Sequence, residues 1–184
     1  QGKTTEAIIY TQKIADAFPG AEIAQGDFRD AQLLFEKGEF EHAEKILDTL
    51  VKEYPNFEEA SILLAIIKYR SGNIKAAADY FNPHVDAEIS NPAVTKLAAI
   101  SSLRNDQPEH VLSMLGRYRH SHNDPQLLIL YGQAALLKNQ NTKAEAALKR
   151  AIDIDPTITE SYLLLADLYN NEKPANKEKA LAIL

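Results

Sequence analysis

Two histidines in one predicted loop come closest to a metal-binding motif in this chain. His120 and His122 flank Ser121, and two imidazole rings at that spacing could share a transition-metal ion. Asp124 is near, but Pro125 follows it, and an acidic residue directly before a proline is typical of a residue that caps the start of a helix. No third ligand is evident in the sequence. We therefore predict a solvated loop here and no metal site.

A second short motif could bind a phosphate group. Gly2-Lys3-Thr4-Thr5 has the residue types that end a phosphate-binding loop, in which backbone amides and a lysine hold a nucleotide. The strand and the first glycine of such a loop are missing, however. The chain also has no cysteine, and no serine, histidine and acidic residue stand in an arrangement known from nucleophilic catalysis. We therefore predict a protein that is not an enzyme and needs no cofactor.

Composition and charge exclude two further classes of partner. The 20 basic residues are scattered among 26 acidic ones, for a net charge of −6. The one basic cluster, Arg117 with Arg119 and His120, is too small to follow a phosphate backbone, so nucleic acid is not expected. No apolar run is long enough to cross a bilayer, so we expect no direct membrane insertion of this segment. The absence of cysteine fits the cytoplasm and the periplasm or cell envelope equally well, so the compartment stays open.

The positions of small residues indicate how the chain is organised. Ala7, Ala43, Ala77, Val111, Ala144 and Ala180 recur at steps of 36, 34, 34, 33 and 36 residues. A residue that favours turns stands five positions before each of the first five: Gly2, Gly38, Gly72, Asp106 and Asn139. Self-similarity at this period is typical of helical repeat arrays, which offer an extended surface for binding and no single catalytic cleft.

The spacing and residue types together resemble the tetratricopeptide repeat (TPR), a unit of two antiparallel helices. The clearest copy runs from Pro125 to Pro156, with a small residue at Gly132, a turn at Asn139 and a second helix that carries Ala144, Leu148 and Ala151. Asp106 and Asn139 depart from the family's turn glycine, but both residue types tolerate the left-handed backbone. The resemblance implies an all-α fold, a right-handed superhelix (α-solenoid) of antiparallel helix pairs.

The repeat frame predicts one solenoid over residues 1–184. We expect a partial repeat at 1–20, repeats near 21–57, 58–91, 92–124 and 125–157, and a partial repeat at 158–184. The predicted helices span 4–18, 22–37, 40–54, 57–70, 73–86, 92–104, 107–121, 125–138, 141–154, 158–171 and 175–184. Pro83 falls within the fifth of these, so that helix should end early or kink. Because the sequence opens at a repeat turn and closes inside a helix, we expect an excised piece whose exposed terminal helices could self-associate.

Small residues are also required where two helices cross closely. Ala31, Ala65, Ala99, Gly132 and Ala166 supply that need in successive repeats. Large apolar residues, many of them leucine, stand between them at spacings that return to one face of a helix.

The resemblance also implies a binding surface, because the first helices of successive TPRs line a concave groove. Transferred residue by residue, the predicted lining is Phe28, Gln32, Phe35, Ile62, Ile66, Tyr69, Arg70, Lys96, Ile100, Leu103, Arg104, Ile129, Gln133 and Leu136. Gln25, Glu59, Gln126 and Leu137 extend it. Heat-shock co-chaperones of this family hold a carboxylate with Lys and Asn at groove positions where this chain has Phe28, Gln32, Ile62 and Ile66, so that clamp is absent. We expect a protein scaffold that binds an apolar peptide or helical segment, with Arg70, Lys96 and Arg104 steering acidic flanks.

An alternative is a structural spacer or a self-association segment. Residues 91–156 also resemble the long bacterial TPR proteins of exosortase/PEP-CTERM export systems. That resemblance implies an envelope-associated assembly linked to exopolysaccharide or protein export.

Overall fold

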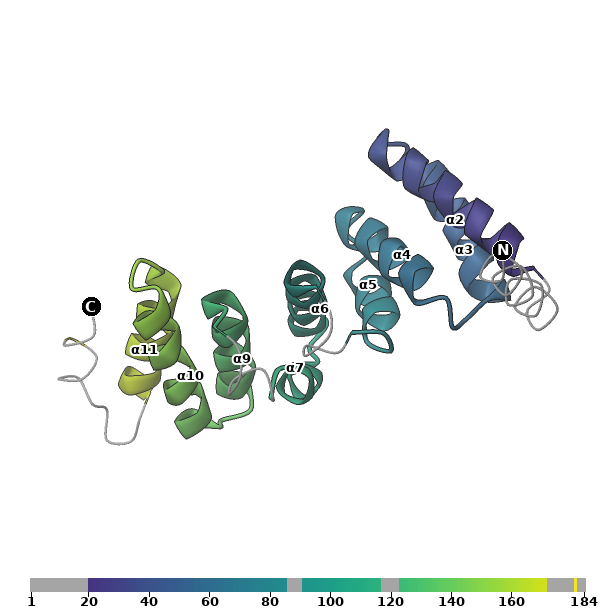
Figure 1. Cartoon of the computed structure of the whole chain (residues 1–184). Coiled ribbons are helices and arrows are strands. Elements are labelled where there is room, and N and C mark those ends of the chain that lie inside the picture. Colours follow the sequence, from purple (N-terminus) through teal and green to yellow (C-terminus); the bar gives the residue numbers. More distant parts are fainter. Residues whose placement is uncertain (1–19, 86–90, 117–122, 172–180, 182–184) are drawn as a thin grey trace, which may run out of the picture. The chain divides into compact units, whose positions relative to one another are not determined.

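The computed structural model describes residues 20–85, 91–116, 123–171 and 181. In this part of the chain all regular structure is α-helical, which confirms the predicted all-α fold. Seven of the helices begin and end within one residue of their predicted bounds. The helices are labelled in Figure 1: α2 (Ala21–Glu36), α3 (Phe40–Glu53), α4 (Glu58–Arg70), α5 (Ile74–Phe81), α6 (Pro92–Arg104), α7 (Pro108–Leu115), α9 (Pro125–Leu137), α10 (Asn141–Ile154) and α11 (Thr159–Asn171).

Within the repeats, first and second helices are separated by short turns that each contain one residue with a left-handed backbone. The four residues are Gly38, Gly72, Asp106 and Asn139, with φ angles of 81°, 82°, 55° and 55°. Asparagine and aspartate are the non-glycine types that enter this conformation most readily. The prediction that Asp106 and Asn139 replace the turn glycine is therefore confirmed.

The same hydrogen bond closes all four turns. In each, the N–H that follows the left-handed residue donates to the carbonyl five positions earlier, as in the Schellman motif. The bonds run from Glu39 N to Leu34 O (2.9 Å), Asn73 N to Lys68 O (2.9 Å), Gln107 N to Ser102 O (2.8 Å) and Gln140 N to Ala135 O (2.8 Å). The four repeats therefore share one turn geometry between their first and second helices.

Contacts divide the chain into two compact units, residues 1–67 and 68–184, with the boundary inside α4. In the first unit, α2 packs against α3 (Figure 1). Ala31, Ala43 and Leu47 are fully buried there. The organisation of all 184 residues as one solenoid stays a prediction.

In the second unit, two clusters of buried side chains form the core. Side chains of α6, α7, α9 and α10 make the first cluster, which contains Ala99, Val111, Leu115, Leu127, Tyr131, Ala134 and Ala147. Side chains of α9, α10 and α11 make the second, which contains Leu128, Ile129, Leu148, Ala151, Leu165, Leu168 and Tyr169. The helix α9 contributes to both clusters, which explains why its sequence, PQLLILYGQAALL, is apolar around most of its circumference.

The recurring small residues lie where the repeat frame requires close packing. Ala43, Ala77, Val111 and Ala144 are all fully buried. At Gly132 the helix α9 lies close to α10, because a Cβ atom there would lie 2.8 Å from Leu148 Cγ. Two positions of the pattern, Ala7 and Ala180, lie outside the described residues.

Two second helices are shorter than predicted. The helix α5 ends at Phe81 and not at residue 86, because Pro83 cannot continue it. Asn82 then links the end of α5 to the following pair: it accepts a hydrogen bond from Ser102 Oγ (3.1 Å) and donates one to Gln107 Oε1 (3.2 Å). The helix α7 ends at Leu115, and residues 117–121 of the predicted helix lie outside the described part. The predicted helix 4–18 also lies outside it, as does the predicted helix 175–184 apart from residue 181.

Candidate functional site

One cavity in the first unit lies between α2 and α4. Its volume is about 270 Å³, and it is lined by Phe28, Gln32, Glu59, Ile62, Leu63 and Ile66. Phe28 and Gln32 stand four positions apart in α2, and in α4 both Ile62 and Leu63 stand three or four positions from Glu59 and from Ile66. Each helix therefore turns a single face toward the cavity. The Phe28 ring is held by Phe57, with 5.0 Å between ring centroids. The structure thus brings together five predicted groove residues: Phe28, Gln32, Glu59, Ile62 and Ile66.

A second cavity, in the other unit, lies between α6, α9 and the start of α11. It has a volume of about 210 Å³ and an aliphatic wall of Ile100, Ile129, Leu130 and Ile158, with Lys96, Gln126 and Glu160 at its polar parts. Ile129 is only 2% exposed and also belongs to the second core cluster. The apolar wall of the cavity is therefore continuous with the protein core.

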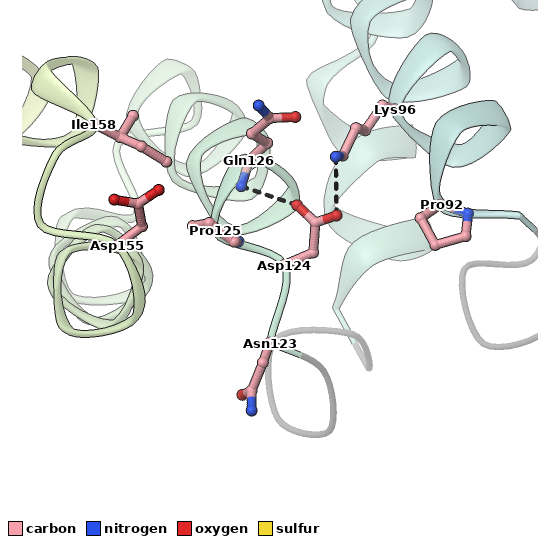
Figure 2. Close-up of a pocket in the computed structure, with 8 residues that line it drawn as sticks. All are labelled: Pro92, Lys96, Asn123, Asp124, Pro125, Gln126, Asp155 and Ile158. Atoms are coloured by element: carbon pink, nitrogen blue, oxygen red, sulfur yellow. Dashed lines mark hydrogen bonds and ion pairs between the residues drawn. The ribbon is translucent and has the colours of Figure 1, made fainter.

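A third cavity, of about 460 Å³, adjoins the second (Figure 2). The two share Lys96, Gln126 and Ile158 among their lining residues. The third adds Pro92, Asn123, Asp124, Pro125 and Asp155. We call the two cavities together the α6–α9–α11 groove, since these three helices or the turns before them supply its lining.

Asp124 organises one side of this groove. Its Oδ1 caps α9 by accepting hydrogen bonds from the backbone N–H groups of Gln126 (3.0 Å) and Leu127 (3.2 Å). Its Oδ2 lies 2.9 Å from Lys96 Nζ, and Figure 2 shows the carboxylate held between Lys96 and the backbone of Gln126. The predicted capping role of Asp124 is confirmed. The charge of Lys96, predicted to steer acidic flanks, is balanced within the groove.

A second polar contact crosses from α9 to α11. Gln133 Nε2 donates a hydrogen bond to Glu160 Oε1 at 2.7 Å. Because a glutamine amide is neutral, this bond orients the Glu160 carboxylate without cancelling its charge.

Three other predicted lining residues lie near the start of the second unit. The Arg104 guanidinium lies over the ring of Tyr69, 6.0 Å from its centroid. A cation–π contact of this kind contributes about 0.5–1 kcal/mol at an exposed site. Arg70 is exposed. None of these three residues lines the three cavities described above.

Another three predicted lining residues pack elsewhere. The Phe35 ring makes an edge contact with Phe40 of α3, with 5.3 Å between ring centroids. Leu103 is half-buried against the first core cluster and Leu136 against the second. Their side chains contribute to packing between helices and line none of the cavities described above.

Sequence reasoning missed several groove residues, three of which lie in α11 or just before it. Ile158, Glu160 and Asp155 were not predicted to line the groove, because the predicted lining ended with the first helix of the repeat at 125–157. The repeat register carries a usable signal: Ile158 follows Pro125 by 33 residues, as Pro125 follows Pro92. All three residues line the groove.

No group of three metal-binding side chains occurs within the described part of the chain. His120, His122 and the Gly2–Thr5 motif lie outside it. His110 does lie within it, and its Nε2 is buried without a hydrogen-bond partner among the described residues, while burial lowers its pKa.

In the same described ranges no helix has the length and apolar character needed to span a bilayer.

Comparison with protein families gave two matches, both to models described as "Tetratricopeptide repeat". One covers residues 1–67 and the other residues 125–158. Together they include 101 of the 184 residues. A comparison with curated protein sequences found no match.

Several solved structures have a similar fold. YrrB, described as a TPR protein with an unusual peptide-binding site, superposes with a TM-score of 0.74 at 18% identity, over 94% of this chain and 91% of YrrB. MamA gives a TM-score of 0.73 at 16% identity, over 88% of each chain. MamA from Desulfovibrio magneticus, from residue 41 to its end, gives 0.66 at 18% identity, over 87% of this chain and 90% of that one. At these identities the likeness shows the fold alone, and the narrower resemblance to exosortase-associated proteins stays a prediction.

Proposed function

Because the chain belongs to the tetratricopeptide-repeat family, we propose that it is a non-enzymatic scaffold that binds an apolar peptide or helical segment of a partner protein. Its binding sites would be the α2–α4 cavity and the α6–α9–α11 groove. TPR proteins are in general scaffolds for protein–protein interaction, and YrrB, which has a similar fold, is described as having a peptide-binding site.

The observation that carries the proposal is where the cavities lie. All three are built almost wholly by the first helices of the repeats, α2, α4, α6, α9 and α11, together with the turns that precede them. Each combines aliphatic or aromatic side chains with at least one side-chain amide, from Gln32 or Gln126. Apolar pockets anchor side chains of a bound segment, and amides can bond its backbone.

The proposal is tested by selecting binders from a phage-displayed library of random peptides. We expect peptides that bind the chain and lose affinity in the Ile100→Ala, Ile158→Ala double variant, by about tenfold or more if either residue is a hot spot. Leu163→Ala is the matched control, because Leu163 is 57% exposed on α11 and lines none of the three cavities. The proposal fails if no peptide is enriched. It also fails if the enriched peptides bind the Ile100→Ala, Ile158→Ala variant and a Phe28→Ala, Ile62→Ala variant of the other cavity as tightly as they bind the unchanged protein.

A second candidate function is self-association. It is favoured by the exposure of Leu163 (57%) and of Leu181 (76%) near the carboxyl end of the chain. Light scattering over a range of protein concentrations tests it: Leu163→Ser should lower the apparent mass if α11 forms an interface between copies. In this alternative the chain would act as a spacer in an envelope-associated assembly linked to export. That part of the alternative rests only on the resemblance of residues 91–156 to the TPR proteins of exosortase/PEP-CTERM export systems.

A further inference from the structure

The charges that line the α6–α9–α11 groove are unequal. Asp124, Asp155 and Glu160 are acidic, and Lys96 is the one cation in the lining. Lys96 is already paired with Asp124 at 2.9 Å. Arg150 does not line the groove, but its guanidinium donates a hydrogen bond to the lining residue Asn123 at 3.0 Å. The lining itself carries a net negative charge, because no cation within it pairs with Asp155 or Glu160.

The hydrogen-bond donors to both carboxylates are neutral groups. Asp155 accepts hydrogen bonds from the hydroxyl and the backbone N–H of Thr157, at 2.6 and 3.0 Å, and these bonds lower the pKa of Asp155. Glu160 accepts its bond from the neutral amide of Gln133. Neither arrangement supplies a positive charge, so a cationic group from outside would find an unmet partner at each.

One residue of the apolar wall, Ile158, lies between the two carboxylates in sequence. Ile158 follows Asp155 by three residues and precedes Glu160 by two, and its side chain lines both cavities of the groove. Ile100 and Ile129 complete an aliphatic surface large enough to hold one branched aliphatic side chain. An occupant that fills this surface would bring its neighbouring residues close to Asp155 or Glu160.

Gln126 adds a group that can hold an extended backbone. Its side chain is exposed, lines both cavities and has no hydrogen-bond partner among the described residues. The backbone N–H of Gln126 donates to Asp124. Figure 2 shows the side-chain amide of Gln126 extending away from Asp124. An amide both donates and accepts, so it can pair with a peptide group of a bound segment.

We infer that the α6–α9–α11 groove selects an extended peptide segment in which a leucine or isoleucine is flanked by lysine or arginine. This inference rests on the proposed function and specifies the partner's chemistry. It reverses the expectation from sequence that cations of the groove would steer acidic flanks, because Lys96 is balanced by Asp124 and the charges left over are negative.

Four fluorescently labelled peptides of equal length test the inference by fluorescence anisotropy. Three carry a central Leu-Ile pair flanked by Lys, by Glu or by Ser, and the fourth carries Ala-Ala flanked by Lys. We expect the Lys-flanked Leu-Ile peptide to bind about tenfold tighter than the Glu-flanked one, since two partly exposed ion pairs each contribute a few-fold. The difference should shrink as salt rises from about 0.1 M to about 1 M, over which the Debye length falls from about 10 Å to about 3 Å. The Ala-Ala peptide should bind weakly.

Net charge requires a matched control, because a chain with a net charge of −6 attracts any cationic peptide. The test variant is Asp155→Asn with Glu160→Gln, which keeps the hydrogen-bond acceptors of both residues. The control is Glu53→Gln with Asp79→Asn, two exposed carboxylates that line none of the three cavities. Both variants remove two negative charges. We expect the test variant to reduce the preference for Lys over Glu to about twofold and the control to preserve it.

Three results would overturn the inference. One is equal affinity for Lys-flanked and Glu-flanked peptides, the second is an equal loss of preference in the test and control variants, and the third is no binding by any of the four peptides. The proposed function is judged separately by the phage selection: if that selection yields groove-dependent peptides without cationic residues, the function stands and the charge selectivity does not.

Discussion

Replacing Gly132 by alanine isolates the packing between α9 and α10. A Cβ atom at this position would lie 2.8 Å from Leu148 Cγ and 2.9 Å from Leu148 Cδ2. Favourable contacts between carbon atoms occur at about 3.5–4.0 Å. Leu148 is fully buried in the second core cluster, so its side chain has little room to move away.

Two opposing effects set the size of the change. Overpacking a close contact costs about 1–3 kcal/mol of the free energy of unfolding. Alanine is favoured over glycine inside a helix by about 1 kcal/mol. We therefore expect Gly132→Ala to destabilise the protein by about 0–2 kcal/mol, although helix propensity alone would make it stabilising.

Gly26 provides the matched control for this substitution. It is also within a helix, α2, but a Cβ there would meet no atom within 4 Å in the described part of the chain. Gly26→Ala should therefore stabilise its helix by up to about 1 kcal/mol. The two changes should differ by about 1–3 kcal/mol.

Native-state amide hydrogen exchange is the assay that suits this comparison, because it measures the free energy of opening separately for the amides of α2 and of α9. A double-mutant cycle with Leu148→Ala should show favourable coupling, since the smaller side chain makes room for the new methyl group. If Gly132→Ala stabilises α9 as much as Gly26→Ala stabilises α2, the close approach of α9 to α10 does not exist in solution and the reasoning is refuted.

Three further perturbations follow from single contacts. Asp124→Ala should lower the free energy of unfolding, measured by urea unfolding, by about 1–2 kcal/mol through loss of the α9 cap. Asp124→Asn keeps the oxygen that accepts the capping bonds and should lower it less. Equal losses for the two variants would argue against the cap. Tyr169→Phe removes the hydroxyl that donates to Glu145 Oε1 at 2.8 Å. It should lower the free energy of unfolding in urea by about 1.5 kcal/mol. An unchanged urea midpoint would contradict this prediction. Burial lowers the pKa of His110, so the unfolded chain binds a proton at higher pH than the folded chain does, and the free energy of unfolding should fall as pH drops through about 6.5. His110→Gln should weaken this dependence of the free energy of unfolding on pH. An unchanged dependence would mean that other groups cause it.

The helical repeat was predictable from sequence because its requirements are local. A left-handed turn needs Gly, Asn or Asp, which are the residues present at Gly38, Gly72, Asp106 and Asn139. The close crossing of α9 and α10 needs a small side chain, and Gly132 supplies it. Pro83 stops α5 because proline has no backbone N–H to donate and its ring clashes with the preceding turn, an effect that also acts within a few residues.

The lining of the groove was predictable only in part, because it depends on side-chain directions across helices. Helical spacing places Leu103 and Leu136 next to the groove residues, but it does not tell which edge of a helix face turns into the core, and both side chains pack there. The ion pair joins Lys96 of α6 with Asp124, which caps α9 and stands 28 positions later. No local sequence pattern reveals such a pair, which balances the charge of Lys96 within the groove.

The position of α9 in both core clusters has a consequence for how the protein unfolds. Repeat arrays can lose structure from an end, one unit at a time, when each unit is coupled only weakly to its neighbours. Opening α9 would instead expose the side chains it shares with α6 and α7 together with those it shares with α10 and α11. The segment from α6 to α11 should therefore behave as one cooperative block, whose amides exchange at a common rate and whose helices melt together.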